Sequence, residues 1–425
     1  MEDGFSGSST VNYEVAVVGA GVAGCVVSQK VASKGFKVCL LERKPSNRIG
    51  EKVCGDGVGK HEFSESNVPP PQSVERQLRG VEFHVLNDIA FTVEGEGYSL
   101  NRSTFGQELL GRALDSGVHL HDSFHVRRLL SDEGHIVGVE GRSLAHGKCR
   151  LNFEVVVDAS GVQGVVRNMA SEGWPIRETP RRFELGVGYR EICRLKEGGE
   201  YCKLFYDWSL TPGGYCWIIP KEGAKANIGI LMPAGLTNIL DLAQRFKAFK
   251  ARMRIKSKPL NSGFGFVPLR APLKYPCWGN LMAVGDAAFL ANPLNGGGIG
   301  PALKSASMAA DALVEALRDQ ESIMKRLWLY NVGVARSFGL KHTVNNALKE
   351  FLLKSNPKEA HSFLHALGFK KTYHSTSFLR EISKPDYLRL LLKLSPKMAY
   401  RLFKVLREAR PLKAFYSRYP PAPTL

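Results

Sequence analysis

The glycine pattern near the start of the chain is the set of residues best suited to chemistry. The run Gly19–Gly24, with the sequence G-A-G-V-A-G, follows a short apolar segment and opens a segment with helical spacing. Such glycines let the backbone approach a pyrophosphate, and the start of a helix offers unpaired N–H groups and a positive potential. Glu42 ends the next apolar run, near the spacing of about 20 residues at which a carboxylate accepts ribose hydroxyls. These residues predict a dinucleotide site, and the carboxylate disfavours NADP.

Later segments distinguish FAD from NAD as the occupant of this site. Asp158–Gly161 and Val166-Arg167 are expected to place an acid, a glycine turn and a base near the cofactor. Gly285-Asp286 follows another apolar run, and Asp286 could accept hydrogen bonds from a ribityl chain. The glycine-rich Pro293–Gly300 precedes a helix whose positive end would face the N1–C2=O edge of a reduced flavin. An NAD dehydrogenase needs no second glycine-rich helix start, so the pattern predicts FAD.

The elements that must position these residues follow from the hydrophobic pattern. Apolar strands over 14–18 and 37–41 enclose a helix over 21–34, which is a βαβ start and implies a parallel sheet. Between 182 and 266 the pattern changes to short alternating strands, typical of an antiparallel sheet. We therefore expect an α/β fold in which a Rossmann-like FAD-binding domain (12–180 and 268–320) carries an inserted antiparallel-sheet substrate domain (181–267). A basic helical C-terminal region (321–425) completes the chain.

Composition and charge narrow the class further. The 425 residues include 58 Lys and Arg against 40 Asp and Glu, a formal charge of +18. No run approaches the ~18 apolar residues of a membrane-spanning helix, and no secretory signal opens the chain, so we expect a cytoplasmic protein. Between Asp386 and Tyr419 basic residues alternate with leucines, which is typical of amphipathic helices on an anionic membrane surface or of a solvated helical face. No nucleic-acid motif accompanies the charge, so no nucleic-acid partner is expected.

The eight cysteines show no C-x-x-C spacing, and we expect neither a metal site nor oxidised thiols by default. Cys25 and Cys39 lie in apolar surroundings and are expected to pack in the core. Cys193 and Cys202 flank a possible hairpin turn at 196–199, which leaves a cross-strand disulfide open.

Together these motifs resemble the flavoprotein group that contains p-hydroxybenzoate hydroxylase. Two further motifs are similar to those of the geranylgeranyl reductases: C-G-D-G at Cys54–Gly57, and P-G-G-Y-C-W-I-I-P at Pro212–Pro220. The resemblance covers about residues 12–320. Val22 stands where the family often has Pro, and Ile219 where it usually has Phe, which changes the expected wall of the lipid tunnel.

The resemblance implies roles for individual residues. It places the adenosine, phosphate and ribityl parts of FAD on Gly19, Gly21, Ala23, Gly24, Glu42, Arg102, Val126 (through its backbone) and Asp286. It places the isoalloxazine ring beside Cys54, Gly55, Gly298 and Ile299, and an isoprenoid channel beside Tyr215 and Trp217. For Tyr215 and Trp217 the alternative is an aromatic pair in a sheet core, and for Cys54 it is a small buried residue.

The implied activity is FAD-dependent saturation of C=C bonds in geranylgeranyl chains, on archaeal-type ether lipid precursors or geranylgeranyl diphosphate. An isolated alkene needs a proton as hydride arrives, and Cys54 is the expected catalytic residue, with water or the flavin as alternative proton sources. A flavin monooxygenase or halogenase on the same fold, or a non-enzymatic isoprenoid-binding flavoprotein, are the alternatives. The electron donor, ferredoxin or another reductant, stays open.

Overall fold

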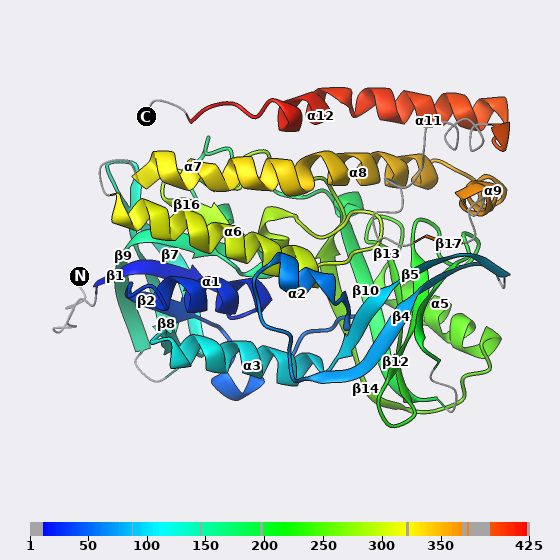
Figure 1. Cartoon of the computed structure of the whole chain (residues 1–425), viewed down its shortest axis with the longest axis horizontal. Coiled ribbons are helices and arrows are strands. Elements are labelled where there is room, and N and C mark those ends of the chain that lie inside the picture. The colour runs from blue at the N-terminus through cyan, green and yellow to red at the C-terminus, as the bar shows by residue number, and fades with distance from the viewer. Residues whose placement is uncertain are drawn as a thin grey trace.

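The computed structural model describes residues 12–86, 88–144, 147–195, 199–319, 323–367, 372–373 and 392–422. Within this part of the chain the strands form two sheets that lie side by side, with helices covering both (Figure 1). The helices are α1 (Val22–Ala32), α2 (His61–Glu65), α3 (Arg102–Asp115), α4 (Val165–Met169), α5 (Ile239–Arg252), α6 (Ile299–Arg318), α7 (Ile323–Val334), α8 (Leu340–Leu353), α9 (Pro357–Leu367), α11 (Pro396–Glu408) and α12 (Arg410–Ser417).

The first sheet has the order β15-β16-β9-β1-β2-β6, and β8 joins β7 to β9. Its strands are β1 (Asn12–Val18), β2 (Val38–Leu41), β6 (His119–His121), β7 (Phe124–Asp132), β8 (His135–Ser143), β9 (Gly147–Asp158), β15 (Cys277–Trp278) and β16 (Leu281–Ala283). β1 pairs in parallel with β2 and with β9, and Val18 lies opposite both Leu41 and Asp158. The three strands therefore end at the same edge, which brings the turns that follow them together.

The buried residues of β1, β2 and β9 are mostly aliphatic, as expected for parallel strands covered on both faces. Helix α1 packs between α6 and α3. Its small residues, such as Ala23 and Cys25, are buried, and this lets the helix lie close to the sheet.

The second sheet has the order β14-β10-β13-β12-β11-β4-β5-β17, and β3 pairs with β5. Its strands are β3 (Gly57–Gly59), β4 (Val74–Val85), β5 (Asp88–Leu100), β10 (Leu185–Arg194), β11 (Tyr201–Tyr206), β12 (Tyr215–Lys221), β13 (Lys225–Pro233), β14 (Pro259–Pro268) and β17 (Thr372–Tyr373). One face packs on α5, and the other packs on α8, α9 and α11. The predicted strands between 182 and 266 are all present. The sheet is mixed rather than purely antiparallel, because β11 pairs in parallel with β4.

The open question of a disulfide is answered by the strand order. Cys193 on β10 and Cys202 on β11 are both free thiols. Strands β13 and β12 lie between β10 and β11, so the segment around 196–199 does not join neighbouring strands of a hairpin. A cross-strand disulfide between these cysteines is therefore wrong for this fold.

The described part of the C-terminal region is mainly helical, as predicted. Helices α7 and α8 follow one another in a line, joined by a π-helical turn at Ala335–Gly339, and α11 and α12 run along the outside of α8 (Figure 1). The start of the predicted basic segment, including Arg389, lies outside the described residues. Among the described residues, no helix is both long and apolar enough to cross a bilayer.

Candidate functional site

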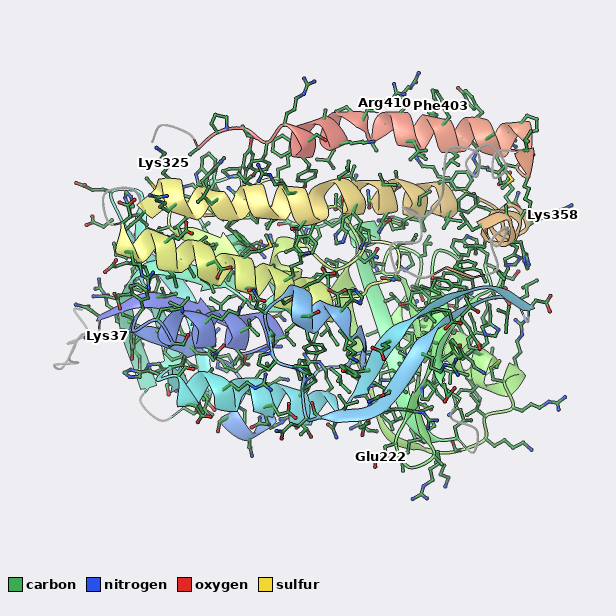
Figure 2. All side chains as sticks on the ribbon, viewed as in Figure 1. Lys37, Glu222, Lys325, Lys358, Phe403 and Arg410 are labelled. Atoms are coloured by element: carbon green, nitrogen blue, oxygen red, sulfur yellow. The ribbon has the colours of Figure 1, made fainter. Side chains whose placement is uncertain are left out.

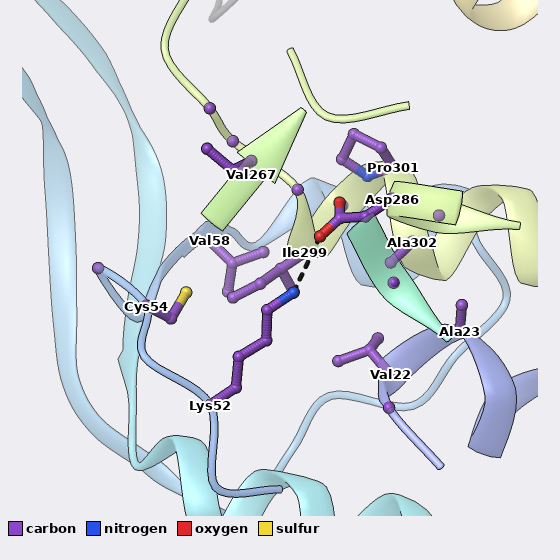
Figure 3. A pocket seen from close by; sticks show the side chains of 18 of the residues that line it. Val22, Ala23, Lys52, Cys54, Val58, Val267, Asp286, Ile299, Pro301 and Ala302 are labelled. Atoms are coloured by element: carbon purple, nitrogen blue, oxygen red, sulfur yellow. Dashed lines mark hydrogen bonds and ion pairs between the residues drawn. The ribbon is translucent and has the colours of Figure 1, made fainter. Parts of the chain in front are cut away.

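A cavity of about 1680 Å³ lies between the two sheets. Its wall combines the turns after β1, β2 and β9, the segment 49–65, the inner face of the second sheet and the start of α6. The predicted site residues lie on this wall, with the exception of Gly24: Gly19, Gly21, Ala23, Glu42, Cys54, Gly55, Arg102, Val126, Tyr215, Trp217, Asp286, Gly298 and Ile299. Part of the cavity is shown in Figure 3, where Cys54, Lys52 and Ile299 surround the same space.

The glycine turn after β1 has the geometry that its sequence predicts. Gly19 has a φ of +106°, and a Cβ atom there would lie 2.5 Å from the carbonyl oxygen of Ala159. A Cβ atom at Gly24 would lie 1.8 Å from the carbonyl oxygen of Gly19, so Gly24 serves close helix–strand packing. Around Gly21, the N-cap of α1, the space is open. The start of α1 therefore faces the cavity with room for a phosphate group.

Glu42, which follows β2, stabilises the glycine turn after β1. Its Oε2 accepts a hydrogen bond from the backbone N–H of Ala20 at 2.8 Å, and its Oε1 accepts one from the N–H of Lys44 at 2.9 Å. Each carboxylate oxygen can accept further hydrogen bonds. The carboxylate can thus shape the glycine turn and still accept ribose hydroxyls. Val126, on β7 near the end of β2, lines the adjacent part of the cavity.

Arg102, the first residue of α3, carries a buried cation toward the cavity. The side chain is 8% exposed, and its guanidinium lies 5.6 Å from the ring centroid of Phe105. Its Nε and Nη1 atoms are buried and have no hydrogen-bond partner among the described residues. Buried guanidinium nitrogens are normally paired. The unpaired nitrogens therefore fit an anionic ligand such as the pyrophosphate of a dinucleotide.

Asp286 follows β16 and forms an ion pair that sequence analysis missed. Its Oδ2 lies 2.9 Å from Nζ of Lys52, and Figure 3 shows Lys52 reaching across the cavity wall to it. The negative charge of Asp286 raises the pKa of Lys52. Lys52 stands two residues before the predicted Cys54, and this proximity was the one sequence signal that could have identified it.

The second glycine-rich turn leads into α6. Gly296 has a φ of +68°, which favours glycine, and Gly298 is the N-cap of the helix. Tyr215 donates a hydrogen bond from its hydroxyl to the carbonyl oxygen of Asn295 in this turn. Because Tyr215 lies on β12, the second sheet holds the turn in place beside the start of α6. The N–H groups of α6 then face the cavity next to Ile299.

The aromatic wall comes from neighbouring positions on one face of β12. The rings of Tyr215 and Trp217 lie 6.0 Å apart between centroids, and both side chains are buried at the edge of the cavity. The indole N–H of Trp217 donates to Oδ1 of Asn227 at 2.9 Å. Trp217 and Ile219 also lie directly beside Gly55. The two motifs that resemble geranylgeranyl reductases, far apart in sequence, thus meet in space.

Cys54 lies on the cavity wall at the junction of these two motifs. Its Sγ accepts a hydrogen bond from the N–H of Asp56 at 3.4 Å, and its carbonyl oxygen accepts one from Nδ2 of Asn227 at 2.8 Å. Burial raises the pKa of the Cys54 thiol, and the charge of Asp56 raises it further. The thiol is therefore neutral near pH 7 and holds a proton that it could donate.

The expected role of Asp158 and Arg167 beside the cofactor is not what the structure shows. Asp158 is fully buried and accepts hydrogen bonds from the N–H groups of Ser160 and Arg167. The Arg167 guanidinium donates to the carbonyl oxygen of Ala287 and lies over the ring of Phe289. Both side chains hold loops together behind the cavity, while Ser160 and Gly161 line it.

Comparison with known proteins shows which families the chain resembles. Residues 184–267 match the geranylgeranyl reductase catalytic domain, and residues 14–184 match the lycopene cyclase family. The chain is 29% identical to a digeranylgeranylglycerophospholipid reductase of Sulfolobus acidocaldarius, over 97% of this chain and 95% of the relative. A protein of the same name from Methanothrix thermoacetophila is 26% identical over 92% of this chain and 98% of its own length.

Solved structures agree on the fold. A geranylgeranyl bacteriochlorophyll reductase-like protein from Thermoplasma acidophilum superposes with a TM-score of 0.82 at 22% identity, covering 93% of this chain and all of its own. A flavin-dependent brominase superposes with a TM-score of 0.68 at 16% identity, covering 94% of this chain. The chain shares the fold of these proteins, and the resemblance to geranylgeranyl reductases that the motifs predicted is confirmed. The chain is thus similar to geranylgeranyl reductases in sequence and in fold.

Proposed function

We propose that the chain is an FAD-dependent reductase that saturates C=C bonds of geranylgeranyl chains on archaeal-type ether lipid precursors or geranylgeranyl diphosphate. The observation that carries this proposal is that a glycine turn of the dinucleotide-binding type and the aromatic residues Tyr215 and Trp217 line the same cavity. The relatives named digeranylgeranylglycerophospholipid reductase and the match to the catalytic domain support the same substrate class.

FAD is the cofactor that fits the residues present. The open space before Gly21 and the unpaired nitrogens of Arg102 suit the pyrophosphate, and Glu42 suits the adenosine ribose. Asp286 would hold the ribityl chain. The remaining contacts proposed for the cofactor come from the backbone or from small side chains, at Gly19, Ala23, Cys54, Gly55, Val126, Gly298 and Ile299. Gly24 would act indirectly, by close packing behind the glycine turn.

The chemistry requires a hydride and a proton. Reduced FAD, when bound, supplies hydride. Cys54 holds a proton on a neutral thiol within the cavity, and Tyr215 and Trp217 line a dry wall that positions an alkene. Burial of a polyprenyl chain contributes ~0.8 kcal/mol per CH₂ group. Binding energy is therefore ample, and positioning of the double bond relative to Cys54 determines the rate.

Mass spectrometry tests the proposal directly. Enzyme reduced by dithionite is incubated with digeranylgeranylglycerophospholipid and, separately, with geranylgeranyl diphosphate. The expected result is a series of products that each gain two hydrogens per double bond. Oxidised enzyme serves as the control and should leave the lipid unchanged. Lipid that binds to the reduced enzyme but keeps its double bonds would favour the alternative of a non-enzymatic isoprenoid-binding flavoprotein.

The fold likeness to a brominase keeps one other enzyme class as a candidate. A flavin monooxygenase or halogenase would form a persistent oxygen adduct when the reduced enzyme meets air, and would then turn over an aromatic substrate. A reductase should reoxidise without such productive turnover. The electron donor is a separate matter, and ferredoxin or another reductant can be tested by its ability to replace dithionite.

We also propose that the C-terminal helices bring the enzyme to the surface of an anionic membrane. Leu402 and Val405 of α11 pack inward, while Tyr400 and Phe403 are 68% and 54% exposed. Figure 2 shows Phe403 and Arg410 on the outer side of these helices, and the Arg410 guanidinium lies 6.0 Å from the Phe403 ring centroid. Exposed aromatics among basic residues suit a lipid headgroup layer, where each cation contributes about 1 kcal/mol.

Vesicle flotation tests the membrane proposal. The protein should float with vesicles that contain phosphatidylglycerol, and less with phosphatidylcholine alone. Phe403→Ser should weaken flotation, whereas Phe183→Ser, at another half-exposed phenylalanine, should not. Equal loss in both variants, or no dependence on anionic lipid, would argue against α11 as the contact.

A further inference from the structure

Behind Cys54 lies a row of buried charged groups. Asp56 and Lys221 are 2% and 4% exposed, and Oδ2 of Asp56 lies 3.4 Å from Nζ of Lys221. Lys221 also forms an ion pair with Glu75 and donates to the carbonyl oxygen of Leu100 at 2.7 Å. The Glu75 side chain is 16% exposed, so the row runs from the cavity toward solvent.

Asp56 joins this row to the cavity. It lines the cavity, has a φ of +67° and donates its backbone N–H to the Sγ of Cys54. Its Oδ2 accepts a hydrogen bond from Nδ2 of Asn227 at 2.8 Å. Its Oδ1 is buried and has no hydrogen-bond partner among the described residues. A buried carboxyl oxygen without a partner costs free energy, which indicates a role other than stability.

We propose that Asp56, Lys221 and Glu75 form a proton path that reprotonates the Cys54 thiolate after each double bond is reduced. This inference rests on the proposed reductase function and on Cys54 as the proton donor. Asp56 is a positioning residue in this scheme, because it acts on the alkene through Cys54.

One alkene carbon receives the hydride that reduced FAD supplies, and the other receives the proton of the Cys54 thiol as its S–H bond breaks. The Cys54 thiolate then takes a proton from the carboxyl group of Asp56, through Oδ1, the oxygen that has no partner among the described residues. The Asp56 carboxylate regains a proton through Lys221, and Glu75 restores it from solvent. Each cycle consumes one hydride and one solvent proton, and the reduced flavin is the two-electron donor.

The surroundings of Asp56 and Cys54 favour a bound proton on each of these groups. Burial raises the pKa of Asp56, while Lys221, Asn227, Arg190 and Arg102 lower it. Burial raises the pKa of Cys54, and Asp56 raises it further whenever its carboxyl group is ionised, while Arg102 and Lys52 lower it. A protonated Asp56 is needed for this reprotonation, so the rate should fall as pH rises through its raised pKa. The thiol loses its proton only at higher pH.

The test uses Asp56→Asn in the FAD-loaded enzyme, with Glu191→Gln as a matched control. Glu191 is also buried in the second sheet, pairs with Lys250 at 2.6 Å and does not line the cavity. We measure reduction of digeranylgeranylglycerophospholipid over successive turnovers, in H₂O and D₂O and across pH. Asp56→Asn should slow turnover at least about tenfold, which is less than the ~10²–10⁴-fold contribution of a positioned acid because water can partly replace the carboxyl group. It should also abolish the decline that Asp56 causes as pH rises and enlarge the solvent isotope effect.

Two further measurements separate a proton path from a structural role. Added formic acid, small enough to enter the cavity, should partly restore turnover in Asp56→Asn. Glu75→Gln, at the outer end, should show the same pH and isotope changes with smaller amplitude, and it provides the test if Asp56→Asn does not fold.

The proton path would be refuted if Asp56→Asn with full flavin content, or Glu75→Gln, had the turnover and the pH profile of the wild-type enzyme. Equal loss in Glu191→Gln would show that only buried charge matters. A wild-type enzyme that reduces no lipid at all would instead refute the proposed function, and with it this inference.

Discussion

Replacing Arg102 with methionine should stabilise the FAD-free protein and at the same time weaken the binding of FAD. The two buried, unpaired nitrogens of Arg102 cost the free protein about 1–3 kcal/mol, the usual penalty for an unsatisfied buried donor. The substitution removes the cation–π contact between Arg102 and Phe105, which contributes about 0.5–1 kcal/mol. A methionine side chain can contact the Phe105 ring through its sulfur atom, and this contact offsets that loss. Arg102→Met should therefore stabilise the FAD-free protein by about 1 kcal/mol.

The same substitution should weaken FAD binding. A hydrogen bond to a charged group contributes about 1.5–3 kcal/mol, which corresponds to a roughly 10- to 150-fold higher Kd. The assays are urea unfolding of FAD-free protein and quenching of flavin fluorescence on titration. Arg43→Met is the control, because Arg43 is an exposed arginine on the same cavity wall. A less stable FAD-free variant with unchanged FAD affinity would refute the assignment of Arg102 to the pyrophosphate.

Three other substitutions address the remaining parts of the site. Glu42→Ala removes the acceptor for the Ala20 N–H, so it should weaken FAD retention by about 1.5–3 kcal/mol and also destabilise the FAD-free protein, as flavin content and urea unfolding would show. Cys54→Ser should keep the fold and FAD but slow lipid reduction at least about tenfold in a single-turnover assay; full activity would leave Cys54 as part of the flavin pocket only. Trp217→Ala should open the cavity wall and change the distribution of partly reduced lipids seen by mass spectrometry, and an unchanged distribution would place the isoprenoid channel elsewhere.

The sequence was sufficient to predict those parts of the site in which a helix or strand and the residues that face the ligand belong to one continuous segment. The turn at Gly19–Gly24 could be predicted because tight turn, helix start and close packing all require glycine at fixed spacing. The parallel strands on either side of α1 are continuous apolar runs, and the structure has them within two residues of the expected ends. The start of α6 was predicted for the same reason.

Other parts of the fold depend on partners that are distant in sequence. Strands β4 and β5 carry many charged residues and glycines, so their pattern is weak, and they become strands by pairing with each other and with β11. The roles of Asp158 and Arg167 were wrong because an acid after a strand can either face a ligand or cap its own turn, and the choice depends on packing.

The same limit explains which parts of the site sequence analysis missed. Asp56 follows Cys54 in an evident motif, but its partners Lys221 and Asn227 lie on strands of the second sheet. Lysine in a strand is usually read as a solvent-facing residue. Lys221 is buried only because β12 passes behind the segment 54–57 and presents one face to it. The chemistry of this site therefore depends on where the two sheets meet: the first supplies the turns that suit a cofactor, and the second supplies the apolar wall and the buried charges beside the thiol.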